Sequence, residues 1–129
     1  MLKYINELKD LNIDKKEYVI FGSGPLAIRN LITNSDIDLL VSQNLWNKLS
    51  KKHKIEKNAN GFEKIEIKHI EIYKDWTNTN YSEDKIIKDS EIINNLPFAK
   101  LKYVIKWKQN RNKEKDKKHL KLIKEYLIF

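Results

Sequence analysis

Hydrophobic and polar positions follow two different periods along this chain, and each period predicts one kind of element. Apolar residues recur at helical spacing in four stretches, residues 1–11, 43–54, 99–107 and 113–127. Strand-forming residues gather instead at 17–21 and 36–41, and a Gly-Ser-Gly-Pro turn follows the first of these runs. Because proline favours the first position of a helix, Pro25 predicts a helix through Ile32 between the two strands.

Residues 64–74, KIEIKHIEIYK, alternate apolar and charged positions but change phase at the centre. A hairpin that turns at Lys68-His69 restores one phase and places all four isoleucines on one face. The same hairpin sets Glu66 opposite Glu71 on the other face, where directly opposed like charges are destabilising. Because Lys-His lacks the glycine or asparagine that two-residue hairpins prefer, a longer turn is the alternative.

The remaining segments complete one domain. Residues 76–95 are polar and turn-prone, with a short helix predicted at 83–88, and two helices follow. The predicted fold is therefore a single α/β domain of the α+β type, in which helices flank a mixed sheet. Its core is expected in residues 1–76 and its C-terminal helical pair in about 96–129.

The composition narrows the class of protein. A chain of 129 residues fits one domain, and without cysteine it offers neither a disulfide nor a thiolate metal site. No apolar run reaches the length of a signal peptide or a membrane span, so we expect a soluble cytoplasmic protein with no membrane partner. The net charge is +8, but among the 26 basic residues only Arg29 and Arg111 are arginine, which phosphate recognition favours. The charge therefore permits an anionic partner without identifying one.

Two aspartates supply the first candidate chemistry. If residues 36–41 form a strand, Asp36 and Asp38 point to the same face, with α-carbons about 6.6 Å apart. Two carboxylates so close repel each other unless a cation lies between them. On its own such a pair is more often a solvated strand end, but the Gly-Ser-Gly turn and a second strand with carboxylates reverse that preference.

Together these residues resemble a known signature. Gly22-Ser23 after a hydrophobic strand, then a helix and the run DIDL at 36–39, is similar to the signature of the DNA polymerase beta-like nucleotidyltransferase superfamily, which includes small minimal bacterial members. Residues 70–76, IEIYKDW, are similar to the later strand on which these enzymes carry a third carboxylate. The lysine-rich residues 100–123 resemble their C-terminal helices.

This resemblance implies a fold, a reaction and a set of residues. A nucleotidyltransferase-like enzyme would move a nucleoside monophosphate from a nucleoside triphosphate to an acceptor hydroxyl with two Mg²⁺ ions, for which Mn²⁺ can substitute. The resemblance implies catalytic and metal-binding roles for Asp36, Asp38 and Glu71. Nucleotide-binding roles are expected for Gly22, Ser23 and Gly24, because free backbone N–H groups before a helix attract phosphates, and for Lys106 from the lysine-rich helix. The superfamily more often has aspartate at the third position, and glutamate is one methylene longer.

Several residues stay open between a functional and a structural role. Glu66 is the reserve for the third carboxylate and Asp75 a weaker one, whereas Glu71 is equally explained as a surface partner of a lysine. Lys108 and Lys113 are placed like Lys106 to approach the triphosphate, but a lysine-rich helix is more often a solvated face. The histidines fit exposed polar positions: His53, His69 and His119. The tryptophans can stack on a base but fit core positions better: Trp46, Trp76 and Trp107.

The alternative function is that of a binding protein, which has the same fold but no catalytic activity. In it the basic helices bind RNA or a partner protein, as in one half of a toxin-antitoxin pair, an idea that rests on the resemblance alone. The enzyme hypothesis leaves the nucleotide open, and its acceptor open among RNA, protein and small molecules. Because so small a chain has little surface for an acceptor, we expect a homodimer or a partner protein to complete the site.

Overall fold

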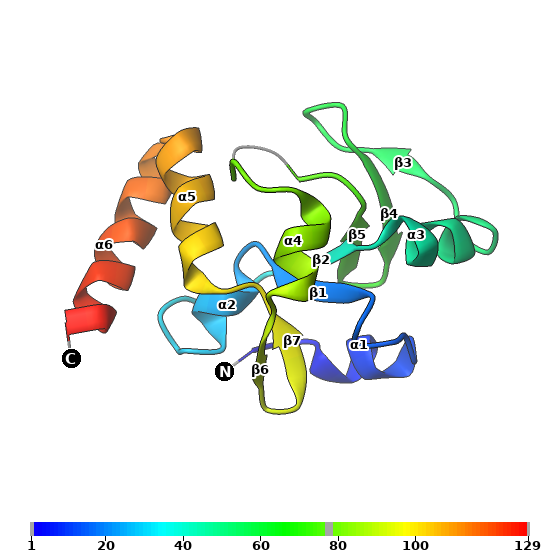
Figure 1. The fold of residues 1–129 in the computed structure, drawn as a ribbon, viewed down its shortest axis with the longest axis horizontal. Coiled ribbons are helices and arrows are strands. Elements are labelled where there is room, and N and C mark those ends of the chain that lie inside the picture. Colours follow the sequence, from blue (N-terminus) through cyan, green and yellow to red (C-terminus); the bar gives the residue numbers. More distant parts are fainter. Residues whose placement is uncertain (1, 77–78, 129) are drawn as a thin grey trace.

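A computed structural model of the chain describes residues 2–76 and 79–128, which form one mixed sheet with helices on both faces (Figure 1). Its seven strands lie in the order β3-β4-β5-β2-β1-β7-β6. The strands are β1 (Tyr18–Phe21), β2 (Ile37–Val41), β3 (Glu56–Lys57), β4 (Glu63–Ile67), β5 (Ile70–Tyr73), β6 (Glu91–Ile93) and β7 (Leu96–Phe98). The helices are α1 (Ile5–Asp10), α2 (Gly24–Ala27), α3 (Gln43–Ser50), α4 (Glu83–Lys88), α5 (Leu101–Arg111) and α6 (Glu114–Ile128). This arrangement confirms the predicted α+β class, with its mixed sheet and C-terminal helical pair.

The central strands owe their place to their composition. β1 and β2 are rich in aliphatic and aromatic residues, as expected of strands that are buried on both faces. They pair antiparallel with Phe21 opposite Asp38, and β5 lies parallel to β2 on its other side with Glu71 opposite Asp38. The strand predicted over residues 36–41 is therefore present as β2, with Asp36 directly before it.

Two hydrophobic cores lie on the two faces of the sheet. The first contains alternate strand residues such as Leu39 and Ile72, which pack with residues of α1 and α3. The second contains Phe21 and Leu40, which pack with residues of α4, α5 and α6. Because successive strand residues point to opposite faces, Asp38 shares the face of Leu40. The carboxylate of Asp38, and that of Asp36 two residues before it, therefore lie on the side that the C-terminal helices cover.

The predicted hairpin in residues 64–74 is confirmed together with its two-residue turn. β4 and β5 pair antiparallel, and Glu66 stands opposite Glu71. Lys68 takes a positive φ of 53°, so the turn forms without the glycine or asparagine that such turns prefer. Burial of the isoleucine face holds the register, because a slip of one residue would expose that face to water.

Three helices are shorter than the sequence pattern predicts, and one of them is α3, which ends at Ser50 instead of residue 54. The helix predicted from Pro25 through Ile32 is wrong in length, because α2 ends after one turn and the backbone reverses at Asn30, where φ is 61°. α1 begins only after Tyr4, which takes a left-handed φ of 71°. The predicted helix at 83–88 is confirmed as α4. The reversal after α2 leaves the chain free to return to the sheet at β2.

Three short strands, β3, β6 and β7, have no counterpart among the predictions. β6 and β7 form a hairpin whose turn, Asn94-Asn95, has φ values of 51° and 67°, a conformation that asparagine tolerates. Residues 96–98 therefore belong to the sheet as β7, parallel to β1, and the helical pair begins only at Leu101. The sheet extends beyond the predicted core of residues 1–76.

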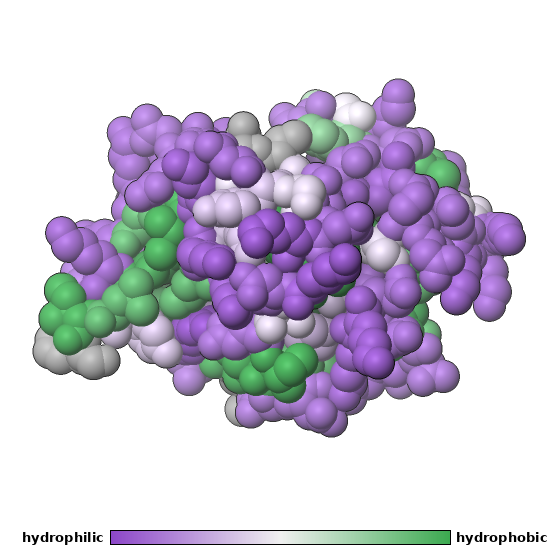
Figure 2. All heavy atoms as spheres, in the orientation of Figure 1, coloured by the Kyte–Doolittle hydropathy of each residue, from purple (hydrophilic) through white to green (hydrophobic). Residues whose placement is uncertain are grey.

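The surface is mainly polar, with apolar side chains gathered at two places on the face that Figure 2 shows. One place is the end of α6, where Leu127 and Ile128 are exposed, and the other is the β6–β7 hairpin with Ile92. Among the described helices, none has the length and apolar character needed to cross a membrane.

Helix α2 packs so closely on β1 that a side chain added at Gly24 should clash with the strand. A Cβ atom added at Gly24 would lie 2.3 Å from Cγ2 of Ile20 in the buried core. We expect Gly24→Ala to lower the free energy of unfolding by about 1 to 3 kcal/mol, as overpacking usually does. Ile20→Ala removes the clashing methyl group, so in urea denaturation the double variant should lose about 1 kcal/mol less than the sum of the single losses. Additive losses would contradict this packing.

Candidate functional site

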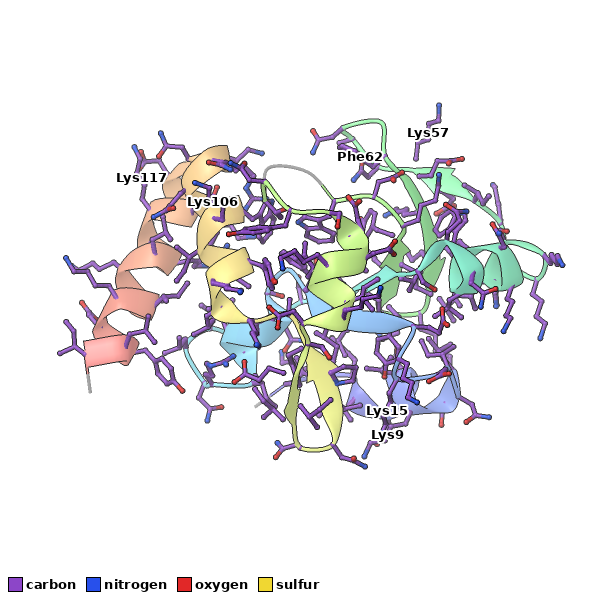
Figure 3. The ribbon with its side chains drawn as sticks, viewed as in Figure 1. Lys9, Lys15, Lys57, Phe62, Lys106 and Lys117 are labelled. Atoms are coloured by element: carbon purple, nitrogen blue, oxygen red, sulfur yellow. The ribbon has the colours of Figure 1, made fainter. Side chains whose placement is uncertain are left out.

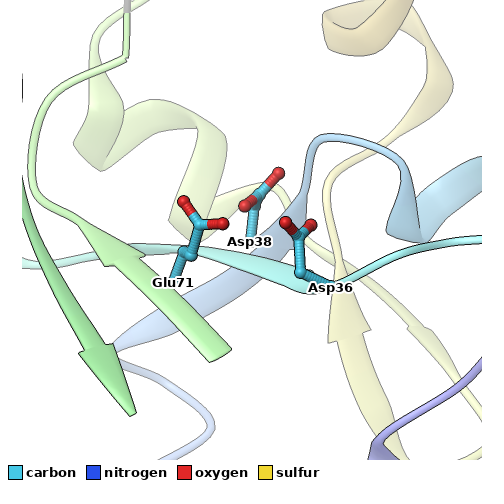
Figure 4. A group of neighbouring side chains, drawn as sticks. All are labelled: Asp36, Asp38 and Glu71. Carbon is cyan, nitrogen blue, oxygen red and sulfur yellow. The ribbon is translucent and has the colours of Figure 1, made fainter. Parts of the chain in front are cut away.

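Three carboxylates meet at the centre of the sheet (Figure 4). Asp36 directly precedes β2, Asp38 lies within it, and Glu71 is on the neighbouring strand β5. The parallel register places Glu71 beside Asp38, and the alternation along the strand keeps Asp36 and Asp38 on one face. One carboxylate oxygen of each residue lies within 4.8 Å of those of the other two. The three side chains predicted as metal ligands are therefore close together in space.

The turn after β1 is shaped to admit the Asp38 carboxylate. Gly22 has a φ of 61°, in the left-handed region that favours glycine. A Cβ atom at this position would lie 2.3 Å from Oδ2 of Asp38. Glycine is therefore required twice, once for the backbone conformation and once for the room that it leaves to the carboxylate.

The carboxylates open into a cavity of about 390 Å³. Gly22 and Ser23 line it on the side of the sheet, while Lys108, Arg111 and Lys115 line it from α5 and α6. The loop between β3 and β4 adds Phe62, which lies across the cavity from these two helices (Figure 3). An acidic centre therefore shares one cavity with a basic wall, defined by Lys108, Arg111 and Lys115.

Burial and mutual repulsion disfavour the charged forms of two of the carboxylates. Burial, followed by the charges of Asp36 and Glu71, raises the pKa of Asp38 to about 8. Burial, followed by a hydrogen bond and charge repulsion with Glu71, raises the pKa of Asp36 to about 6. Without a cation Asp38 holds its proton at neutral pH, whereas Asp36 is protonated only below about pH 6. A divalent cation would displace those protons, as expected of a metal site.

Neighbouring donors keep Glu71 ionised. Burial alone would raise its pKa, but hydrogen bonds with Asp36, Tyr73 and Lys64 hold the pKa of Glu71 below its usual value. Tyr73 Oη donates to Oε1 of Glu71 over 2.8 Å, and Lys64 Nζ approaches the same oxygen at 3.3 Å. The reserve candidate, Glu66, is exposed and bonds to Lys64 at 3.1 Å. The fold thus brings Glu71, and not Glu66, to the two aspartates.

A buried aspartate arranges the basic wall. Asp116, on the first turn of α6, accepts two hydrogen bonds from the Arg111 guanidinium, at 2.8 and 2.6 Å, and one from the Lys113 backbone N–H at 3.0 Å. Lys108 Nζ lies 3.5 Å from Asp116 and 2.9 Å from Nδ1 of His119. Burial lowers the pKa of Lys108 to about 8, although the charge of Asp116 opposes this. Asp116 thereby holds Lys108 and Arg111 at the cavity.

Two of the residues predicted to bind nucleotide lie elsewhere. Neither Gly24 nor Lys106 is among the described residues that line the cavity. Gly24 packs in the core against Ile20, and Lys106 extends from α5 outside the lining (Figure 3). The positive charge that α5 brings to the cavity comes from Lys108 and Arg111 instead.

Of the residues whose role the sequence leaves open, some line the cavity and others do not. Asp75 lines the cavity but lies outside the carboxylate cluster. Trp46, on α3, is in the core, whereas Trp76 and Trp107 line the cavity. His119 lines it as well, and within the described chain the other two histidines do not. The cavity therefore combines carboxylates, cations and aromatic rings.

Sequence patterns do not identify Arg111 and Lys115 of the basic wall, nor do they identify three further residues of the site. Tyr73 stands two residues after Glu71 on one strand, so a shared face was the available signal. Asp116 stands three residues after Lys113, which precedes α6, and this is the spacing at which a side chain reaches back to the start of a helix. Phe62 carries no such signal, because it reaches the cavity only through the path of the β3–β4 loop.

The residues present fit a divalent cation that prefers oxygen ligands. Three carboxylates supply hard oxygen donors, which Mg²⁺ and Mn²⁺ share as ligands. The repulsion among them supplies the electrostatic reason for a cation. Comparisons with protein-family models, curated proteins and solved structures found no match to this chain. Its function is therefore inferred from the geometry of the site.

The raised pKa of Asp38 predicts how the stability of the metal-free protein depends on pH. Because the folded-state pKa of about 8 exceeds the usual value of 3.8, the proton on Asp38 stabilises the fold at low pH, and this contribution is lost as pH rises toward 8. Asp38→Asn keeps the shape but removes the charge. Its advantage over wild type in free energy of unfolding should therefore grow by on the order of 3 kcal/mol from pH 5 to pH 8.

Urea denaturation in the presence of a chelator measures this difference. Asp10→Asn, at the exposed end of α1, is the matched control, and its difference from wild type should stay constant over the same range. A constant difference for Asp38→Asn as well would show that the carboxylate is not destabilised in the fold.

Proposed function

We propose that this protein is a nucleotidyltransferase, which transfers a nucleoside monophosphate from a nucleoside triphosphate to an acceptor hydroxyl and releases pyrophosphate. One observation carries the proposal. Asp36, Asp38 and Glu71 converge beside the Gly22-Ser23 turn, in a cavity that also has a basic wall. The resemblance of these residues to the DNA polymerase beta-like superfamily supports it.

Asp36, Asp38 and Glu71 would hold two Mg²⁺ ions, or Mn²⁺ in their place. When bound, the ions supply the positive charge that neutralises the attacking and leaving oxygens of phosphoryl transfer. The two aspartates lie on one face of the sheet next to Glu71, so the ligands come from two adjacent strands of a rigid core. Such a rigid support favours a fixed reaction geometry.

Glu71 has a second role toward the acceptor. Tyr73 and Lys64 donate to one oxygen of Glu71 and thereby fix the orientation of its carboxylate. Because these donors help to keep it ionised, Glu71 can accept a hydrogen bond from the acceptor hydroxyl and orient the hydroxyl for attack.

The triphosphate would lie between the turn and the basic wall. Backbone N–H groups of Gly22 and Ser23, with the Ser23 hydroxyl, are donors for phosphate oxygens. Across the cavity, Lys108, Arg111 and Lys115 supply positive charge for the same chain of phosphates. The acidic centre and the basic wall would thus share one ligand.

The acceptor needs more surface than the cavity offers. A volume of about 390 Å³ is that of a small-molecule site. An RNA, protein or small-molecule acceptor would therefore rest partly on a second copy of the chain or on a partner protein. The need for nucleoside triphosphates and Mg²⁺ would place the reaction in the cytoplasm.

Calorimetric titration of ATP, GTP, CTP and UTP in the presence of Mg²⁺ tests the proposal. We expect at least one nucleotide to bind the wild type, and to lose this binding when Mg²⁺ is chelated or when Asp36→Asn and Asp38→Asn are combined. The nucleotide that binds, labelled at its α-phosphate, is then offered RNA, protein and small hydroxylated acceptors. Unchanged label transfer by the double variant would overturn the proposal.

Titration of an RNA oligomer beside the four nucleotides tests the alternative function. If no nucleotide binds and an RNA oligomer binds instead, with affinity that falls steeply as salt rises, the basic helices are an RNA-binding surface. The carboxylates would then have no part in that activity.

Two exposed lysines of α6 provide a matched test of the basic wall. Lys115 lines the cavity and its charge interacts with both aspartates, whereas Lys117 lies outside the lining and pairs with Glu114 (Figure 3). Lys115→Ala should weaken nucleotide binding about two- to fivefold, as expected for one exposed ion pair. Lys117→Ala and Lys106→Ala should leave the affinity unchanged in the same titrations. Equal losses in all three variants would show that only the overall charge matters.

A further inference from the structure

Phe62 is an aromatic residue of the cavity that belongs to neither hydrophobic core. It stands in the loop between β3 and β4 and is partly exposed. Within the part of the chain that the structure describes, no second aromatic ring and no cation packs on its ring. Its side chain extends from the loop toward the body of the domain, whereas that of Lys57 extends away from it (Figure 3). The ring is therefore an apolar surface that a ligand in the cavity can reach.

Hydrogen bonds to Asn58 fix the position of Phe62. Oδ1 of Asn58 accepts from the backbone N–H groups of Asn60 and Phe62, at 2.9 and 3.0 Å, and the Asn58 N–H donates to the Phe62 carbonyl at 2.9 Å. The Asn58 side chain also lies beside the hydroxyl of Tyr73, which donates to Glu71. The loop is thus tied to the strand of the third carboxylate. Because Phe62 is already held in place, a ligand that packs on it loses little affinity to ordering of the loop.

The ring lies at the end of the cavity where the nucleoside would extend. In the proposed function, the basic wall binds the outer phosphates, and the metal ions at the carboxylates hold the phosphate next to the nucleoside. The base and the terminal phosphate are opposite ends of a nucleoside triphosphate. Phe62 lies across the cavity from the helices that carry the basic wall (Figure 3). A ligand whose phosphates contact that wall therefore directs its base toward the β3–β4 loop.

The other rings of the cavity are less suited to bind a base. Tyr73, Trp76 and Trp107 line the cavity as well, but their rings already contact one another. Tyr73 meets Trp76 edge to face at 5.4 Å, and Trp76 meets Trp107 in the same way at 5.2 Å. The Trp107 ring in addition faces two cations of the basic wall, at 4.7 and 4.3 Å. Phe62 is the ring that stands apart from this cluster.

We infer that the ring of Phe62 stacks on the base of the bound nucleoside triphosphate, an inference that rests on the proposed function and names the residue that holds the base. Stacking tolerates every base, because each has a π face. Purines have the larger face and gain the most contact. Phe62 therefore favours ATP and GTP over CTP and UTP without any hydrogen bond to the edge of the base.

NMR on the wild-type protein tests this contact directly. The ring protons of Phe62 are assigned through the backbone of the isotope-labelled chain, and ATP, GTP, CTP and UTP are added with Mg²⁺. For a nucleotide that binds, we expect the base protons to move upfield in the ring current of Phe62. The same protons should give intermolecular NOEs to the Phe62 ring. This measurement does not depend on whether any variant folds.

Affinity gives a second readout. Phe62→Leu stays apolar but lacks the ring, so we expect it to bind the same nucleotide about five- to tenfold more weakly. Inorganic tripolyphosphate has no base, and its affinity should not change. Phe62→Trp restores a ring and should bind the nucleotide at least as tightly as wild type. Tyr126→Leu removes an exposed aromatic residue outside the cavity lining and is the matched control, with both affinities unchanged.

The outcomes separate this inference from the proposed function. Metal-dependent nucleotide binding without base contacts to Phe62 would overturn the inference alone. Equal losses of nucleotide and tripolyphosphate affinity in Phe62→Leu would also overturn it, since they would show a purely structural role. Base contacts to Phe62 in binding that needs neither Mg²⁺ nor the aspartates would support the contact and overturn the proposed function. If none of the probes binds, both are overturned.

Discussion

Repulsion among three carboxylates is the constraint on which the site depends. Asp38 and Glu71 stand side by side because β2 and β5 pair in parallel, and Asp36 follows the same face. On the other face of these strands, Leu39 and Ile72 are fully buried, so a slip that separated the charges would expose the core. Hydrophobic burial thus stabilises an arrangement that electrostatics opposes, and the site is left with an affinity for positive charge.

The residues around the carboxylates make this arrangement of like charges possible. Gly22 leaves room for Asp38, while Lys64 and Tyr73 keep Glu71 ionised. The basic wall is built separately, because buried Asp116 holds its cations by hydrogen bonds within the C-terminal helices. The two halves meet only across the cavity, where one ligand with negative phosphates and bound metal would satisfy both.

Local chemistry explains which elements the sequence reveals. The β4–β5 hairpin is recognisable because apolar and charged residues alternate along it, and because only one register places its four isoleucines on the buried face. The β6–β7 hairpin is harder to recognise, since its strands are three residues long and its turn, Asn94-Asn95, is the main signal. The length of α2 is overestimated because its sequence pattern continues beyond the point where the helix ends. Apolar spacing after Pro25 fits a helix, but the chain must reverse at Asn30 to return to the sheet.

The sequence by itself determined that Asp36 and Asp38 lie on the same face of one strand and that Glu66 and Glu71 lie on the same face of one hairpin, because side-chain alternation along a strand is a local property. Only the tertiary structure chose Glu71, since that choice depends on β5, and not β4, lying next to β2. The lysines of α5 and α6 show the same limit. Which of them reach the cavity depends on how each helix is rotated when its apolar residues pack on the sheet, and that rotation is set by contacts between residues far apart in the chain.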